Sequence, residues 1–340
     1  MTQGNKKRLP GVFVTRLAIA VVALGATLGI AACGGDDSKS IDLVAYSTPQ
    51  EAYEEGIIPA FQKTPDGDGV DVSTSFGGSG DQSRAVEAGQ PADVVAFSLE
   101  PDITREVDAG LVSADWNKNQ YKGIVTDSVV TLVVRKGNPK NIQTFDDLVR
   151  DDVEVITANP ATSGGARWNI MAVYGSQIKQ GKSPAEALDF VKQVLANTVV
   201  QDDSARDSLN TFKSGKGDVL IAYENEAIQA QKEGLDVDYV TPDSTILIEN
   251  PVAVTQDADP VAQKFVDFLY TDEAQQEFAD AGYRPVVESV LDKNASKFPT
   301  PSGLFTIAEF GGWSEVSDAF FGDPDGSVIK IEQELGNPTS

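Results

Sequence analysis

Residues 217–226 read GDVLIAYENE, an apolar run that ends in a short polar turn and the start of a helix. The run at 219–223 has the length and composition of a buried strand, and 225–232 has the length of a helix. The same order of strand, short loop and helix recurs along the chain from Ile41 onward. Strands that alternate with helices predict an α/β fold with a mostly parallel sheet.

The other predicted elements follow this pattern. Predicted strands cover residues 41–47, 70–76, 93–97, 128–135, 153–157, 198–201, 219–223, 237–240, 245–249 and 252–255. Predicted helices cover residues 49–61, 80–88, 101–109, 144–149, 164–174, 184–196, 205–213, 225–232, 260–269 and 272–281. Several helix starts carry capping signals, and in Ser79-Gly80-Asp81-Gln82 we expect Ser79 to be the N-cap.

Composition excludes several classes of function. The 340-residue chain carries 27 Lys and Arg against 52 Asp and Glu, so general nucleic-acid binding is not expected. It has no His and one Cys, which excludes His-based triads, His/Cys zinc sites and a disulfide framework. We predict no metal site and no cofactor. The acidic stretch 66–71 lacks the distal Glu of a calcium-binding loop and is expected to be a surface turn.

The first 32 residues have the layout of a secretion signal. Basic residues precede an uncharged apolar run at 17–32, which is shorter than the roughly 20 residues that span a bilayer. Small residues then precede Cys33, an order that resembles the bacterial lipobox. We expect a signal peptide over 1–32, lipid attachment at Cys33, and a flexible tether over 33–40 that holds the protein on the outer face of the cell membrane. An ordinary signal peptide with an incidental cysteine is the alternative.

Five loops place hydroxyl groups or glycines between a strand and the next helix. They are residues 44–48, 76–80, 162–166, 203–206 and 222–225. In open α/β sheets, ligands bind where such loops meet, beyond the carboxyl ends of the strands. Helix N-termini offer unpaired N–H groups and a partial positive charge, so they bind anions without Lys or Arg. Each loop alone is more typical of an ordinary turn, but the five together predict an anion-binding cleft.

Six motifs carry a family resemblance. They are 75–80 (SFGGSG), 134–140 (VRKGNPK), 159–169, 217–226, 282–285 (GYRP) and 310–313 (FGGW). In this order they closely resemble the sulfate-binding proteins of bacterial ABC importers, and the resemblance runs from about residue 41 to residue 321. It implies a monomeric, extracytoplasmic or periplasmic solute-binding protein that captures sulfate and delivers it to the permease of an ABC transporter. It implies no enzymatic activity.

The resemblance also implies a two-lobed fold of the type II periplasmic-binding-protein class, with the ligand in a cleft between the lobes. Residues 41–127 with 250–321 would form the first lobe, and 128–249 the second. The chain would cross between them near 128–135 and 244–255, where the sequence is extended and β-branched. The packing of residues 322–340 is left open.

Position by position, the resemblance implies a set of ligand donors. These are the backbone N–H groups of Ser47, Ser79, Gly164, Gly165 and Ala205, the hydroxyl of Ser163, and the side chain of Tyr223 at the place of an indole donor. Arg167 and Arg206 are expected to support helix ends and lobe packing without contacting the ligand.

Three departures from the family pattern bear on the site. Ser47 stands where Asp is common, which changes little because the donor is the backbone. Tyr223 stands where an indole is common, and its phenol has a shorter reach. Asp81 stands where Lys is common, and we expect its carboxylate to face solvent at the helix start.

Two alternatives stay open at this stage. The same module could be specific for thiosulfate, molybdate or phosphate instead of sulfate. Hydrogen phosphate carries a proton and requires an acceptor carboxylate, which only Asp81, Asp202 or Asp203 could supply near these loops. A carboxylate-based hydrolase outside the cytoplasm is a more distant alternative, since it requires two carboxylates in the cleft with separated pKa values.

Overall fold

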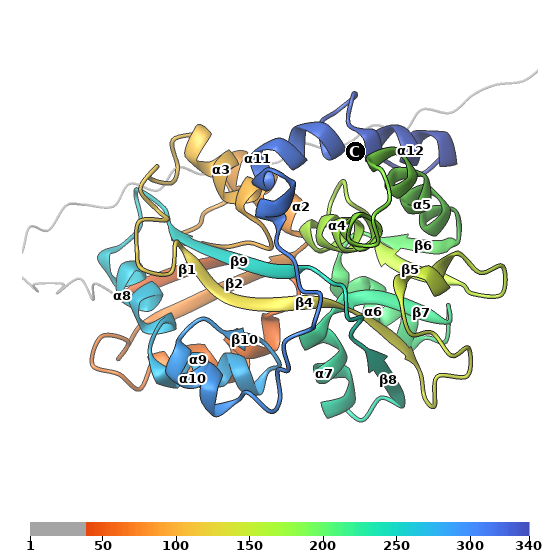
Figure 1. Cartoon of the computed structure of the whole chain (residues 1–340). Coiled ribbons are helices and arrows are strands. Elements are labelled where there is room, and N and C mark those ends of the chain that lie inside the picture. The colour runs from red at the N-terminus through yellow and green to blue at the C-terminus, as the bar shows by residue number, and fades with distance from the viewer. Residues whose placement is uncertain (1–38, 340) are drawn as a thin grey trace, which may run out of the picture. The chain divides into compact units, whose positions relative to one another are not determined.

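A mixed β-sheet organises residues 39–339, the part of the chain that the computed structural model describes (Figure 1). The strand order is β2–β1–β3–β9–β4–β7–β5–β6, and β8 and β10 also pair with β4. The strands are β1 (Ser40–Tyr46), β2 (Asp71–Gly77), β3 (Val94–Ala96), β4 (Ile124–Arg135), β5 (Val155–Ala158), β6 (Thr198–Asp202), β7 (Val219–Tyr223), β8 (Val237–Val240), β9 (Leu247–Val254) and β10 (Arg284–Pro285). The predicted signal peptide and Cys33 lie outside the described residues.

The sheet has two sets of parallel strands. β1 pairs in parallel with β2 and β3, and β5 pairs in parallel with β6 and β7. We call β1–β3, with the helices that follow them, the first half, and β5–β7, with theirs, the second half. All pairings of β4 and β9 are antiparallel, so the α/β fold is confirmed but the whole sheet is mixed.

The long strands β4 and β9 lie side by side in the middle of the sheet (Figure 1). One part of β4 pairs with β9, and the other part pairs with β7 and β8 in the second half. The predicted break between 245–249 and 252–255 is wrong, because β9 continues through Pro251. The register shifts between Ile124 and Thr126 opposite this proline, and such an irregularity accommodates a residue without an N–H donor.

The helices agree with the predicted ones to within a few residues over most of the chain. They are α1 (Ile58–Phe61), α2 (Ser79–Glu87), α3 (Glu100–Asp108), α4 (Gly164–Lys179), α5 (Pro184–Ala196), α6 (Ala205–Lys213), α7 (Glu224–Lys232), α8 (Pro260–Leu269), α9 (Asp272–Asp280), α10 (Glu288–Lys293), α11 (Gly312–Val316) and α12 (Ser327–Leu335). Residues Ala52–Ile57 form a π-helix before α1, and Phe145–Val149 form a short 3-10 helix. No helix among the described residues is both long and apolar enough to cross a membrane.

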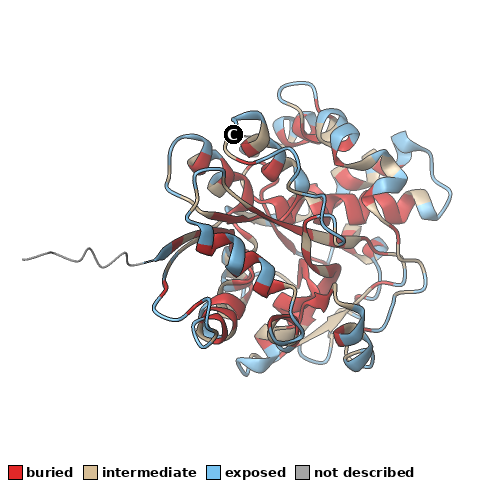
Figure 2. Ribbon diagram, turned by 90° about the vertical axis from the view of Figure 1, so that its left-hand side faces the viewer, coloured by how far each residue is buried: buried red, intermediate tan, exposed pale blue. Residues whose placement is uncertain are grey.

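The core lies along the strands and the inner faces of the helices, while the outer helix faces are exposed (Figure 2). Helix α4 is buried over most of its length. The C-terminal segment covers it: the ring of Trp313 in α11 meets Trp168 of α4 edge-on at 4.6 Å, and α12 packs against α5. Residues 322–339, whose packing the sequence left open, therefore pack against helices of the second half.

Two carboxylates, those of Asp127 and Glu249, lie opposite each other on the neighbouring strands β4 and β9. Asp127 of β4 is the register partner of Glu249 of β9 on one side and of Arg284 of β10 on the other. The guanidinium of Arg284 is bonded to Glu224, with 2.8 Å between Nε and Oε2. Burial, with the charge of Glu249 added, raises the pKa of Asp127 to about 8.

Asp127→Asn is expected to stabilise the protein at high pH. The folded state holds the Asp127 proton more tightly than the unfolded chain does, so this residue lowers the free energy of unfolding as pH rises from about 4 to about 8. The amide removes the charge and keeps the shape. Because stability falls by about 1.4 kcal/mol for each pH unit between the two pKa values, we expect a gain of several kcal/mol in the free energy of unfolding at pH 8.5 and none at pH 4.

Chemical denaturation of the wild type and the variant at both pH values measures this gain. Asp257→Asn, at an exposed position, is the matched control and should change neither value. An equal gain for Asp127→Asn at both pH values would show that the pKa of Asp127 is not raised.

Candidate functional site

The predicted loops meet where helices of the two halves approach each other. The N–H of Gly80 in α2 donates to the carbonyl of Thr162, at 3.0 Å, and the guanidinium of Arg84 donates to the carbonyl of Ala161, at 3.1 Å. Gly165 of α4 has both Ala205 of α6 and the ring of Tyr223 as neighbours. These contacts bring the N-termini of α2, α4 and α6 to one place.

The loop after β1 joins the same group. The ring of Tyr46, at the end of β1, lies 6.3 Å from that of Tyr223. Arg206 at the start of α6 donates to the carbonyl of Thr48 and pairs with Glu51. The structure therefore brings together all five loops that the sequence analysis selected.

The helix starts carry unpaired donors. Ser79, Gly164 and Ala205 are the first residues of their helices, and Gly165 is the second of α4. N–H groups at these positions have no carbonyl partner within the helix. Within residues 39–339, the N–H groups of these four residues donate to no other group of the protein. Unpaired N–H groups at helix starts are the kind of donor that binds anions. Ser47, the remaining predicted N–H donor, is buried directly after β1.

Ser163 adds a hydroxyl to these donors. It is the N-cap of α4, it is 3% exposed, and its Oγ accepts from the N–H of Ala166 at 3.3 Å. Because the oxygen acts as the acceptor in this contact, the hydroxyl hydrogen remains free to donate. The side chain can thus cap the helix and bind an anion at once.

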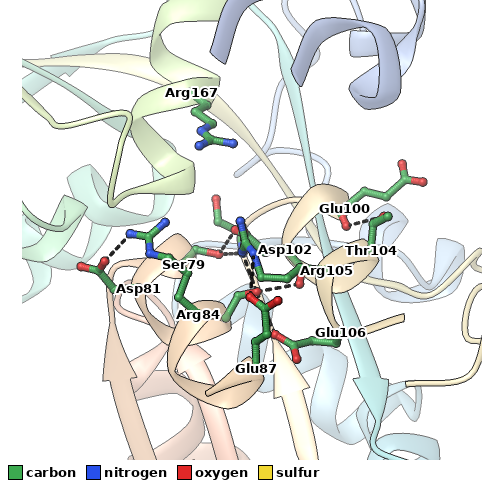
Figure 3. Close-up of polar contacts among 12 residues, drawn as sticks. Ser79, Asp81, Arg84, Glu87, Glu100, Asp102, Thr104, Arg105, Glu106 and Arg167 are labelled. Atoms are coloured by element: carbon green, nitrogen blue, oxygen red, sulfur yellow. Dashed lines mark hydrogen bonds and ion pairs between the residues drawn. The ribbon is translucent and has the colours of Figure 1, made fainter. Parts of the chain in front are cut away.

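The hydroxyl of Ser79 is committed elsewhere. Its Oγ donates to Oδ2 of Asp102 in α3 at 2.6 Å and accepts from the N–H of Ser98 at 2.9 Å (Figure 3). The expected N-cap role of Ser79 is wrong, because Gly78 occupies the N-cap position and Ser79 begins the helix. Ser79 therefore has only its backbone N–H to offer a ligand.

Tyr223 is bonded across the site to Ser98. Its phenol oxygen lies 2.6 Å from Ser98 Oγ, and both residues are 1% exposed. Burial raises the pKa of Tyr223 well above its ordinary value, so the phenol stays protonated. Trp168 Nε1 and Asn250 Nδ2 both donate to the carbonyl of Ser98, each at 2.9 Å.

Sequence reasoning missed Ser98, Asp102, Trp168 and Asn250. A signal for Ser98 was present, because it follows the predicted strand 93–97 and precedes the predicted helix 101–109, as the five selected loops do. The other three lie within helices or a strand. Nothing in their local sequence separates them from ordinary buried residues.

The arginines near the site are occupied by other partners. Arg206 pairs with Glu226, at 3.0 Å, and with Glu51; burial alone would lower the pKa of Arg206, but these two carboxylates raise it. Arg167 donates from Nε to the carbonyl of Pro160 at 2.9 Å and lies over the ring of Phe321. Both guanidinium groups are thus occupied by other groups of the protein.

The carboxylates that could accept a proton from a ligand are also placed. Asp81 forms an ion pair with Arg84 on the outer side of α2, and about half of its side chain is exposed (Figure 3). Asp203 is exposed, and Asp202 accepts from the hydroxyl of Thr211 at 2.9 Å. Asp102 is buried behind Ser79, where it accepts from that hydroxyl and pairs with Arg105 at 3.3 Å. Of these carboxylates, Asp203 and about half of the Asp81 side chain are thus exposed to solvent, and Asp102 is bonded to Ser79 and Arg105.

Three comparisons with known proteins show what the chain is similar to. Residues 41–284 match the model of the family described as bacterial extracellular solute-binding protein. The sulfate-binding protein of Synechococcus elongatus is 42% identical over 336 residues, which cover 93% of this chain and 95% of that protein. The sulfate-binding protein of Synechocystis sp. is 41% identical over 309 residues, 87% of each chain. The structure of the sulfate-binding protein SubI from Mycobacterium tuberculosis superposes with a TM-score of 0.80 at 46% identity, covering 82% of this chain and 98% of that one.

Proposed function

Because the chain belongs to the bacterial extracellular solute-binding protein family, we propose that it captures sulfate outside the cytoplasm and delivers it to an ABC transporter for import. The observation that carries this proposal is the meeting of three helix N-termini with unpaired N–H groups beside the hydroxyl of Ser163. The relatives that are named sulfate-binding proteins support sulfate as the anion.

The ligand would be held by N–H groups and hydroxyls alone. The donors would be the N–H groups of Ser47, Ser79, Gly164, Gly165 and Ala205 with the Ser163 hydroxyl. A hydrogen bond to a charged group contributes roughly 1.5–3 kcal/mol, so these six bonds would contribute roughly 9–18 kcal/mol, more than the roughly 8 kcal/mol of micromolar binding. The surplus offsets the cost of desolvating sulfate and of bringing the two halves together.

The proposal includes a two-lobed arrangement with the boundaries given above, 41–127 with 250–321 and 128–249. Support comes from the middle position of β4 and β9, through which the chain passes from one half of the sheet to the other. Support also comes from the contact between Gly80 and Thr162, which joins loops of the two halves.

We also propose that Cys33 is lipidated and holds a monomeric protein at the outer face of the cell membrane. The order of basic residues, apolar run and small residues before Cys33 supports this anchor. A catalytic role is not part of the proposal, because the proposed donors come from Ser, Gly and Ala, and the two carboxylates of the five loops do not form a pair: Asp203 is exposed and Glu224 is bonded to Arg284.

Isothermal titration calorimetry of the purified protein tests the function. We expect sulfate to bind at one site per chain, more tightly than thiosulfate, molybdate or phosphate. Tighter binding of another oxyanion would support the role as a solute-binding protein but would show that sulfate is not its preferred ligand. Absence of binding by all four anions would refute the proposal.

Ser163→Ala is expected to weaken sulfate binding by about tenfold, because one acceptor of the buried anion loses its donor. The substitution also removes the N-cap of α4, which costs stability in its own right. Ser183→Ala is the matched control, since Ser183 caps α5 with the same side-chain contact and is exposed. Calorimetry should show a loss of affinity for Ser163→Ala alone, and equal affinities for the two variants would remove Ser163 from the site.

A further inference from the structure

We propose that Ser98 holds the two halves together around the anion and that Tyr223 serves this role as the partner of Ser98, not as a ligand donor. The inference rests on the proposed function, because it concerns how the same site retains sulfate. Ser98 was not among the predicted site residues, and its contacts reach four different elements.

Two contacts bond Ser98 to α2 of the first half and to the middle strand β9. Its backbone N–H donates to Ser79 Oγ, which in turn is held by Asp102, so the start of α2 is positioned through Ser98. Its carbonyl accepts from Nδ2 of Asn250 in β9 at 2.9 Å. Asn250 is itself fully buried, and its Oδ1 accepts from the hydroxyl of Thr126 in β4. Ser98 is therefore held from the side of β4 and β9 as well.

Two further contacts of Ser98 come from the second half. Trp168 of α4 donates its indole N–H to the same carbonyl at 2.9 Å, and Tyr223 at the end of β7 meets the hydroxyl at 2.6 Å. Helix α4 also begins directly against Ser98. A Cβ atom placed on Gly164 would lie 2.8 Å from both Cβ and Oγ of Ser98, so only glycine permits this approach.

Three of these contacts use the backbone of Ser98, and one uses its side chain. The bonds of the N–H and the carbonyl persist when Ser98 becomes alanine, whereas the bond between Oγ and the phenol of Tyr223 is lost. Both groups of that bond are almost fully buried, so the loss leaves the phenol without its partner. An unpaired buried polar group costs roughly 1–3 kcal/mol, which is a factor of about 5 to 150 in an equilibrium constant.

The experiment is a double-mutant cycle with Ser98→Ala, Tyr223→Phe and the double variant, read by stopped-flow tryptophan fluorescence during sulfate binding and release. Trp168, bonded to Ser98 and in contact with Trp313, supplies the signal. We expect each single variant to release sulfate about tenfold faster, with the association rate unchanged, because the bond has to break before the halves separate and release the anion. The double variant should be no worse than either single variant, since all three lack the same bond.

Ser176→Ala is the matched control. Ser176 is 2% exposed like Ser98, but its hydroxyl bonds the carbonyl of Val173 within the same helix, so its loss should leave sulfate release unchanged. A dissociation rate of Ser98→Ala equal to that of the wild type would overturn the proposal. So would a double variant in which the two effects multiply to about 100-fold, because Tyr223 would then act on the anion independently of Ser98.

Measuring the Tm of the same four proteins without anion tests the bond between Ser98 and Tyr223 independently of sulfate binding. Coupled Tm losses, with the double variant no less stable than the worse single variant, support the bond between Ser98 and Tyr223, and additive losses argue against it. If the wild type binds no sulfate, the proposed function is refuted and the unfolding cycle decides on this bond. Should Ser98→Ala not fold, Tyr223→Phe removes the same bond while filling the same space.

Discussion

Gly78→Ala is expected to weaken sulfate binding by about 100-fold while the protein stays folded. The backbone of Gly78 has φ −59° and ψ 130°, which alanine adopts without strain. A Cβ atom there would lie 2.8 Å from the carbonyl oxygens of Asp203 and Thr162. Both oxygens belong to the backbone of the second half, so they cannot turn aside as the end of a side chain can.

The size of this effect follows from the separation of the α2 start from the loops at Thr162 and Asp203. To admit the methyl group, the start of α2 has to move away from the loops before α4 and α6. That movement breaks the contact of Gly80 with Thr162 and displaces the N–H of Ser79 from an anion held by the second half. The loss of two such bonds, at roughly 1.5 kcal/mol each, corresponds to about 100-fold in the dissociation constant.

Gly77→Ala is the matched control for this variant. A Cβ atom on Gly77 would lie 2.6 Å from Nε2 of Gln82, the movable end of a flexible side chain. Calorimetry should show sulfate affinity within about threefold of the wild type for this neighbour, as expected for a substitution that needs only a side-chain rotation. If Gly78→Ala bound sulfate as tightly as Gly77→Ala, the loops of the two halves would not enclose the anion in the arrangement described.

Sulfate is expected to bind at least about 100-fold more tightly than phosphate at neutral pH. Hydrogen phosphate carries a proton, and in a site made of donors that proton faces another hydrogen. An unpaired buried group costs roughly 1–3 kcal/mol, and two opposed donors cost more. Of the nearby carboxylates, Asp81 is engaged with Arg84 in solvent and Asp102 with Ser79 and Arg105. Asp202 accepts from Thr211 through Oδ1 but has no partner for Oδ2 within residues 39–339, and Asp203 is exposed.

The same preference should persist from about pH 5 to pH 8. The chain has no His to change charge in this range, and burial raises the pKa of Tyr223 above it. Competition calorimetry at three pH values within the range measures the preference. Equal affinities for the two anions would show that a carboxylate reaches the ligand, and Asp102→Asn would then identify or exclude the buried candidate.

Much of the fold was predictable from local sequence. The helix over Pro184–Ala196 lies where residues 184–196 were predicted to be helical, and Ser183 forms a capping box with Glu186 at its start. Apolar runs such as 219–223 are buried strands as expected, because their length and β-branched composition suit little else. The five loops could be selected because all of them place glycines or hydroxyl groups at a helix start, although each one alone is more typical of an ordinary turn.

The missed residues depend on contacts between distant segments. Ser98 meets Tyr223 from 125 positions away and Asn250 from 152 positions away, and no periodicity in the sequence reports such a pairing. The predicted cap at Ser79 failed because Ser79 Oγ accepts from the N–H of Ser98, 19 positions later, instead of from an N–H of its own helix. Local propensity correctly found the helix but could not decide between two N–H donors for one oxygen.

The unpaired N–H groups at the starts of α2, α4 and α6 also decide which genetic changes this site can tolerate. Alanine scanning would pass over most of the site, because exchanging a side chain leaves a main-chain donor in place. A change of side chain at these positions therefore leaves the donor in place as long as the chain keeps its path, but Gly164 has to stay glycine because a Cβ atom there would lie 2.8 Å from Ser98. Proline alone deletes such a donor, and the first position of a helix is where proline is best accepted.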